Sequence, residues 1–107
     1  RLASLYRISK SRGLVVVDVR RKNEWDPGHI PGALHIPLGD LPARMGEIPA
    51  DQPVAVHCQG GGRSAIAASL LLARGRQEVS NVTGGFGDWI KAGLPTENAP
   101  LRERTKA

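Results

Sequence analysis

The sequence predicts an α/β domain with a mainly parallel sheet of roughly four to five strands and helices on both faces. Short apolar runs rich in Val, Ile and Leu alternate with segments of helical pattern along the whole chain. The run at residues 14–19 is almost entirely β-branched, as in a parallel strand that is buried on both faces. The length of 107 residues suits one domain of ordinary size.

Four segments are expected to be strands because each is a short apolar run between turn residues. They are residues 14–19, 33–36, 53–57 and 79–83.

Helices are expected between these strands, where apolar residues recur at helical spacing and glycine follows as a C-cap. Asp40 would cap the third of them, with Pro42 in its first turn, and Ser64 would cap the fourth. The helical segments are residues 2–11, a turn or short helix within 20–26, and residues 41–48, 64–74 and 85–92. We expect residues 1–97 to form the domain and residues 98–107 a polar C-terminal tail.

The charge pattern narrows the possible partners. The net charge is +5, but the basic residues are scattered and the aromatic content is 4%, so no nucleic-acid partner is expected. A small anionic substrate attracted to a cleft fits this charge better. No apolar run reaches the roughly 18 residues of a membrane span, so no membrane partner is expected. The single cysteine cannot form an internal disulfide, which favours a reducing, cytoplasmic location.

That cysteine, Cys58, lies between a predicted buried strand and a predicted buried helix, in the sequence CQGGGRS. Backbone N–H groups and the positive end of the helix dipole converge at such a junction and favour an anion or a thiolate. We therefore expect the thiol pKa to be lowered and the thiolate to act as a nucleophile. By itself, this junction is compatible with phosphate, sulfur or redox chemistry. The binding-loop candidates are Gln59, Gly60, Gly61, Gly62, Arg63 and Ser64.

Three motifs of the chain resemble those of the rhodanese family and occur in the same order. The loop resembles the family's C-x-x-G-x-R-S form through Cys58, Gly61, Arg63 and Ser64. The upstream matches are Asp18, Val19, Arg20, Glu24, Trp25, residues 28–33, Ile36 and Pro37. The downstream matches are Gly84, Gly85, Trp89 and residues 92–95.

This resemblance implies a three-layer domain and a sulfurtransferase that uses no metal and no organic cofactor. The Cys58 thiolate would take a sulfane sulfur from a small anionic donor such as thiosulfate and form a persulfide. Cyanide, or a thiol in cells, would then accept the outer sulfur in a second step. Because the chain has one cysteine, the acceptor must be external.

Among the enzymes that this chain resembles, the length of the loop from cysteine to arginine differs between the sulfurtransferases and their relatives. Cys58 to Arg63 is a six-residue loop, as in sulfurtransferases of this kind, whereas the related phosphatases and arsenate reductases have a longer loop. The alternatives left open are a non-catalytic or regulatory interaction module and a phosphatase or arsenate reductase. The run at residues 58–71 also resembles rhodanese domains fused behind metallo-β-lactamase-like domains, so a fused or partner domain is a further expectation.

Four residues outside the loop are candidates for supporting roles. Asp18 is expected to accept hydrogen bonds from the backbone or from Arg20, and Arg20 and Glu24 are expected to form an ion pair. His29 fits a packed loop histidine better than a general base, because a thiolate stabilised by its loop needs none. No metal-ligand spacing around Cys58 is present in the sequence. Arg63 could bind substrate or support the loop.

Overall fold

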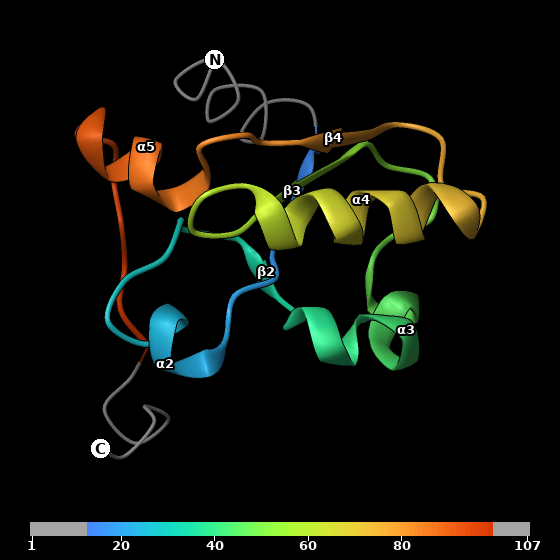
Figure 1. Cartoon of the computed structure of the whole chain (residues 1–107), viewed down its shortest axis with the longest axis horizontal. Coiled ribbons are helices and arrows are strands. Elements are labelled where there is room, and N and C mark those ends of the chain that lie inside the picture. The colour runs from blue at the N-terminus through green and yellow to red at the C-terminus, as the bar shows by residue number, and fades with distance from the viewer. Residues whose placement is uncertain (1–12, 100–107) are drawn as a thin grey trace.

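The computed structural model describes residues 13–99, so the predicted helix at residues 2–11 and most of the predicted tail lie outside the described residues. A four-stranded parallel sheet forms the centre of this region, in the order β2-β1-β3-β4 (Figure 1). The strands are β1 (Val15–Asp18), β2 (Leu34–His35), β3 (Val54–His57) and β4 (Val79–Asn81). Each lies within a segment that the sequence predicts as a strand.

The register of the sheet brings the carboxyl ends of three strands to one edge. Asp18 at the end of β1 is paired with His35 of β2 and with His57 of β3. The residues that follow these strands therefore meet at the same edge, which is where parallel α/β sheets bind ligands.

The helices α2 (Lys22–Trp25), α4 (Gly62–Ala73) and α5 (Gly85–Lys91) fall within or near their predicted segments. The single helix predicted at residues 41–48 is wrong in its extent. Helix α3 (Leu41–Arg44) has one 3-10 turn before it, η1 (Leu38–Asp40), and another after it, η2 (Met45–Glu47). A glycine within η2, Gly46, weakens the α-helix at that point.

The core has two parts, one on each face of the sheet, which confirms the predicted arrangement of helices. Val17 of β1 packs with Leu41 of α3 and Leu71 of α4. Its neighbour Val16 packs on the opposite face with residues of α5. Consecutive strand residues point to opposite faces, so one buried strand serves both parts of the core.

The chain segment after α5 returns to the loop that follows α2. Glu97 forms an isolated antiparallel bridge with His29. The N–H of Ala99 donates to the carbonyl of Asp26 at 3.1 Å, and Ala99 is buried. The domain boundary at residue 97 stays a prediction.

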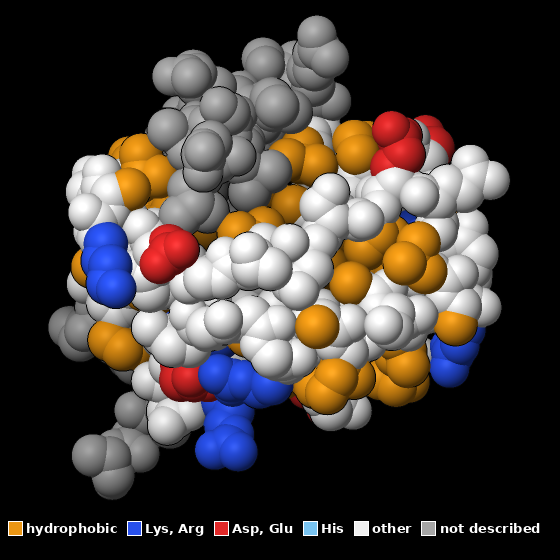
Figure 2. Space-filling view, turned by 45° about the horizontal axis from the view of Figure 1, so that its top comes forward, with side chains coloured by type: hydrophobic (Ala, Val, Ile, Leu, Met, Phe, Trp, Pro, Cys, Tyr) orange, Lys and Arg blue, Asp and Glu red, His pale blue; other side chains and the backbone are white. Residues whose placement is uncertain are grey.

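Two observations concern the predictions that the chain has no nucleic-acid partner and no membrane partner. On the face that Figure 2 draws, basic side chains lie at separate places along the margin and form no continuous patch. Between residues 13 and 99, none of the helices has the length and hydrophobicity needed to cross a bilayer.

Candidate active site

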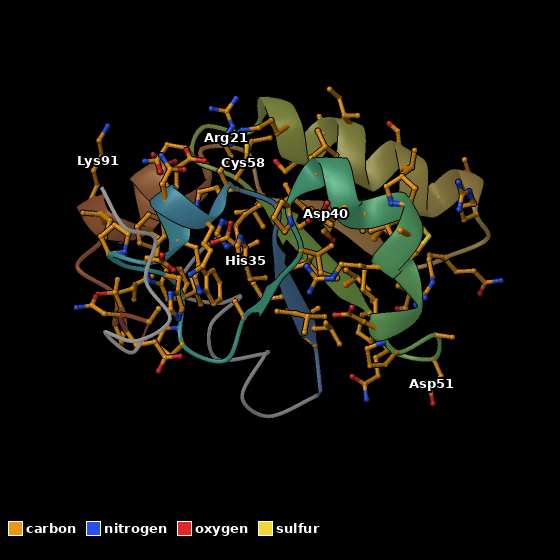
Figure 3. All side chains as sticks on the ribbon, turned by 90° about the horizontal axis from the view of Figure 1, so that it is seen from below. Arg21, His35, Asp40, Asp51, Cys58 and Lys91 are labelled. Carbon is orange, nitrogen blue, oxygen red and sulfur yellow. The ribbon has the colours of Figure 1, made fainter. Side chains whose placement is uncertain are left out.

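Cys58 directly follows β3 and lies at the edge of the sheet where the strands end (Figure 3). The side chain is 1% exposed, and its sulfur faces the turn that leads into α4. The N–H of Gly61 donates to Cys58 Sγ at 3.0 Å, and Ser64 Oγ lies 3.5 Å from the same sulfur. The sulfur is therefore held at the amino end of a twelve-residue helix.

The turn requires glycine at position 61. Gly61 has φ +112°, where a side chain is strained, and a Cβ there would lie 3.4 Å from the backbone of Thr83 and Gly84. This conformation aims the Gly61 N–H at Cys58 Sγ and makes Gly61 the N-cap of α4.

The prediction that Ser64 caps this helix is wrong, because the helix begins two residues earlier, at Gly62. Ser64 is instead a fully buried residue of the first turn. Its hydroxyl lies 3.1 Å from the carbonyl oxygen of Gly61 and 3.5 Å from Cys58 Sγ, and its single hydrogen can be donated to either of them. Gly62 and Arg63 add this half-turn to the helix. The glycine-rich sequence predicted both residues to be part of the loop.

The surroundings lower the pKa of the Cys58 thiol below its usual value. Burial raises the pKa of Cys58, but the Ser64 hydroxyl and the N–H groups of Ser64, Gly61 and Gly60 together outweigh burial. Hydrogen bonds donated to sulfur favour the charged form, as does the helix amino end. The site therefore favours a thiolate.

The first turn of α5 holds the loop from the other side, and sequence reasoning missed this role. The N–H of Phe86 donates to the carbonyl of Cys58 at 2.8 Å, and the N–H of Gly87 donates to the carbonyl of Gln59 at 3.1 Å. A Cβ on Gly85 would lie 2.1 Å from the Cys58 carbonyl oxygen, so only glycine fits there. The pair Gly84-Gly85 was the available signal.

Asp18 and Arg20 form a buried ion pair beneath the loop. The Arg20 guanidinium contacts both carboxylate oxygens of Asp18, and its shortest contact is 2.8 Å. Arg20 is 2% exposed and Asp18 is 0% exposed. The same guanidinium donates to the carbonyl of Gly28 at 2.9 Å and to Gln59 Oε1 at 3.3 Å. It also lies 4.2 Å from the centre of the Phe86 ring. Arg20 thus joins β1 to the loop and to α5.

The predicted ion pair between Arg20 and Glu24 is wrong, since each has a different partner. Glu24 pairs with Arg63, 39 residues away, through two contacts of 2.7 and 2.9 Å. The hydrogen bonds from Arg63 lower the pKa of Glu24 to about 2, although partial burial raises it. The Glu24 carboxylate in turn raises the pKa of Arg63. Helix α2 is therefore fastened to the beginning of α4.

His29 lies in a stack of three rings, with Trp25 and His35. The His29 ring lies 3.4 Å from the Trp25 ring, which is also stacked on His35 at 4.6 Å. His29 Nδ1 is 2.9 Å from the carbonyl of Trp25, and its Nε2 is 3.5 Å from Glu97. These contacts fit a packed loop histidine, and they brace α2.

His57 is a buried histidine that precedes Cys58, and it contacts both Asp18 and the Cys58 carbonyl, which lies 3.3 Å from its Nδ1. Its Nε2 lies 3.6 Å from Asp18 Oδ2 and has no hydrogen-bond partner among the described residues. Burial lowers the pKa of His57, and the Arg20 charge acts in the same direction, although Asp18 opposes both. A neutral imidazole is therefore favoured there.

Candidate metal-ligating side chains do not cluster in the part of the chain that the structure describes. Within residues 13–99, no group of three or more His, Cys, Asp and Glu side chains is placed to hold a metal ion. The site instead combines a thiolate-stabilising turn, two ion pairs and a helix amino end. Such a site can carry out nucleophilic catalysis at sulfur.

Comparison with known proteins gives a consistent result. Residues 2–92 match the Rhodanese-like domain family. A protein of Allochromatium vinosum named "Sulfurtransferase" is 38% identical over 89 residues, which are 83% of each chain. The "Thiosulfate sulfurtransferase GlpE" of Coxiella burnetii is 34% identical over 88% of this chain and 87% of its own length.

A solved structure agrees with these matches. The crystal structure of a rhodanese-related protein from Thermoplasma volcanium superposes with a TM-score of 0.82 at 33% identity, covering 91% of this chain and 94% of the other. Other relatives are longer, since the chain spans only 45% of the length of two further curated proteins.

Proposed function

This chain belongs to the rhodanese-like domain family, and on that premise we propose that it is a sulfurtransferase with Cys58 as nucleophile. The observation that carries the proposal is the position of Cys58 Sγ, which accepts the Gly61 N–H at 3.0 Å in a turn that lowers the thiol pKa. A thiolate, and not a thiol, is the nucleophile in sulfur transfer.

In the first step, the Cys58 thiolate attacks the outer sulfur of a sulfane donor such as thiosulfate. A sulfur–sulfur bond forms to Cys58, the bond within thiosulfate breaks, and sulfite leaves with the electron pair. The product is a Cys58 persulfide anion. The N–H groups of Gly60, Gly61 and Ser64 already lower the Cys58 pKa, and they support an anion in this loop.

In the second step, an acceptor such as cyanide or a thiolate attacks the outer sulfur of the persulfide. The Cys58 thiolate is then the leaving group, and its low pKa makes it a good one. Because Cys58 is the only cysteine, the acceptor must come from outside this chain. A cytoplasmic location, where thiols stay reduced, is part of this proposal.

In this mechanism, the remaining candidate residues hold the loop in place. Arg63 is bound to Glu24, and Arg20 joins Asp18 to Gln59, so these charged groups support the loop through ion pairs. Gly62 continues the helix from the N-cap, and His29 braces α2 through Trp25. No metal or organic cofactor takes part.

Intact-mass measurement after incubation with thiosulfate tests this function. We expect the wild type to gain one sulfur atom and to lose it again when cyanide is added. Cys58→Ser should gain none, and Ser69→Ala, an exposed change on the same helix, should behave as the wild type. Failure of the wild type to gain sulfur from any sulfane donor would refute the proposal. Rapid hydrolysis of an aryl phosphate would favour a phosphatase instead.

A further inference from the structure

The charged side chains that contact the Cys58 loop are arranged as two neutral pairs. Asp18 compensates Arg20 at 2.8 Å, and Glu24 compensates Arg63 at 2.7 Å. At these separations, the field of each guanidinium is largely cancelled by its carboxylate at the distance of an incoming ligand. Neither arginine therefore supplies much net positive charge to attract an anion.

Arg21 is the exception at this edge of the sheet. Its N–H donates to Glu24 Oε1 at 2.9 Å, and the same oxygen binds Arg63 of the loop. The Arg21 backbone therefore lies at the rim of the loop, and Figure 3 shows Arg21 and Cys58 at the same end of the molecule. The side chain is exposed, and no ion pair within residues 13–99 involves its guanidinium.

We propose that Arg21 is a specificity-determining residue whose uncompensated charge selects anionic over neutral reactants at Cys58. For sulfur donors, this inference rests on the function proposed above. A thiolate and a thiosulfate dianion repel each other as they approach. The charge of Arg21 can offset that repulsion without a direct contact between Arg21 and the donor. Exposed charges interact over about one Debye length, which is about 10 Å at 0.1 M salt.

The charge of Arg21 acts on the encounter of reactant and enzyme, and the bonds made and broken are unchanged. Steering of this kind raises the second-order rate constant and is weakened by salt. The effect should grow with the charge of the reactant. A dianion should therefore lose about twice as much, on a logarithmic scale, as a monoanion when Arg21 is neutralised.

Alkylation of Cys58 tests this without requiring any sulfur transfer. Iodoacetate is an anion and iodoacetamide is its neutral counterpart of similar size, so the ratio of their rate constants reports the local charge. We expect Arg21→Gln to lower this ratio about threefold at low salt. Arg21→Lys should keep the wild-type ratio. Arg74→Gln removes the same charge at the far end of α4 and should also leave it unchanged.

Sulfur loading by mass spectrometry extends the test to donors of different charge. For Arg21→Gln, we expect the rate constant to fall about tenfold with thiosulfate and about threefold with benzenethiosulfonate, a monoanion. Both falls should nearly disappear in 0.5 M NaCl, where the Debye length is shorter than about 5 Å.

The outcomes separate this inference from the proposed function. An alkylation ratio that is unchanged in Arg21→Gln, or that falls equally in Arg74→Gln, would overturn the role of Arg21. Equal slowing by iodoacetate and iodoacetamide would also overturn it, because that result indicates a structural effect. If the ratio falls as expected but the wild type takes up no sulfur, charge selection stands and the sulfurtransferase proposal fails.

Discussion

At the scale of single residues, the reactivity of Cys58 depends on two short contacts. The Gly61 N–H and the Ser64 hydroxyl both lie next to Sγ, at 3.0 and 3.5 Å. Burial alone would raise the thiol pKa, so the lowered pKa depends on hydrogen bonds donated to sulfur. Ser64 is the only one of these donors that a substitution can remove without changing the backbone.

Ser64→Ala should make Cys58 less reactive at neutral pH. Removing the hydroxyl raises the thiol pKa, so the pH profile of alkylation by iodoacetamide should shift to higher pH. We expect the rate at pH 7 to fall about fivefold, the equivalent of one hydrogen bond of about 1 kcal/mol. Ser69→Ala, on the exposed side of α4, is the matched control. Superimposable profiles for Ser64→Ala and the wild type would contradict this role.

At the scale of elements, the site is held by contacts between helices that are distant in the sequence. The start of α5 fixes the Cys58 carbonyl, while α2 reaches α4 through Glu24 and Arg63. Neither α2, at four residues, nor α5, at seven, is long enough to be stable alone. Their contacts with the loop and with the core therefore determine where they lie.

Gly85→Ala should disturb both the fold and the site. The new Cβ would meet the Cys58 carbonyl oxygen at 2.1 Å, at a residue whose φ is +49°. We expect a loss of about 2 kcal/mol or more in the free energy of unfolding, measured with urea, and slower alkylation of Cys58. Gly46→Ala, where a Cβ meets nothing within 4 Å, is the control and should cost little. Equal stability of the two variants would be evidence against the contact.

Glu24→Gln should weaken the fold in a pH-dependent way. The hydrogen bonds from Arg63 lower the pKa of Glu24 from 4.5 to about 2. The stability from this pair is therefore complete above pH 4.5 and is lost as the pH falls towards 2. Both side chains are partly exposed, so we expect a difference below about 1 kcal/mol at pH 7.

Urea unfolding of the wild type and of Glu24→Gln at several pH values measures this difference. The two stabilities should converge near pH 2, where the wild-type carboxylate takes up a proton. A difference that stays constant from pH 7 to pH 2 would show that charge pairing is not its cause.

At the scale of the whole molecule, a sheet with two buried faces provides the rigid base of the site. Val16 and Val17 of one strand pack into the two parts of the core. The carboxyl ends of β1 and β3 are thereby fixed side by side, with Asp18 as the last residue of β1 and Cys58 directly after β3. Stability and site geometry should therefore depend on the same buried residues.

Two neighbouring leucines of α4 test this dependence. Leu71 is fully buried, whereas Leu72 is 51% exposed. We expect Leu71→Ala to lower the free energy of unfolding by about 2 to 5 kcal/mol, because it leaves a cavity under the sheet. Leu72→Ala should change it by less than about 0.5 kcal/mol. Denaturant titration measures the free energy of unfolding of both variants. A similar loss in the two would contradict the position of Leu71 in the core.

Between residues 13 and 99, the sequence alone was sufficient for the order of the strands and main helices and for the position of Cys58. Residues 14–19 and 53–57 carry strand patterns that depend on neighbouring residues only, and so does the helical run after Ser64. Cys58 could be placed at a strand–helix junction because that junction is a local feature. The glycines around it indicated a tight turn for the same reason.

The tertiary structure alone decided which groups meet at that junction. Glu24 was expected to bind Arg20, four residues away, but it binds Arg63, 39 residues away. The contact of α5 with the Cys58 carbonyl likewise joins segments from different strand–helix units. Such pairings depend on which loops the parallel strands bring to one edge, and no local pattern encodes that. The pairing of Arg20 with Asp18 and of Arg63 with Glu24 follows from this arrangement. Arg21 is left without an ion-pair partner among residues 13–99.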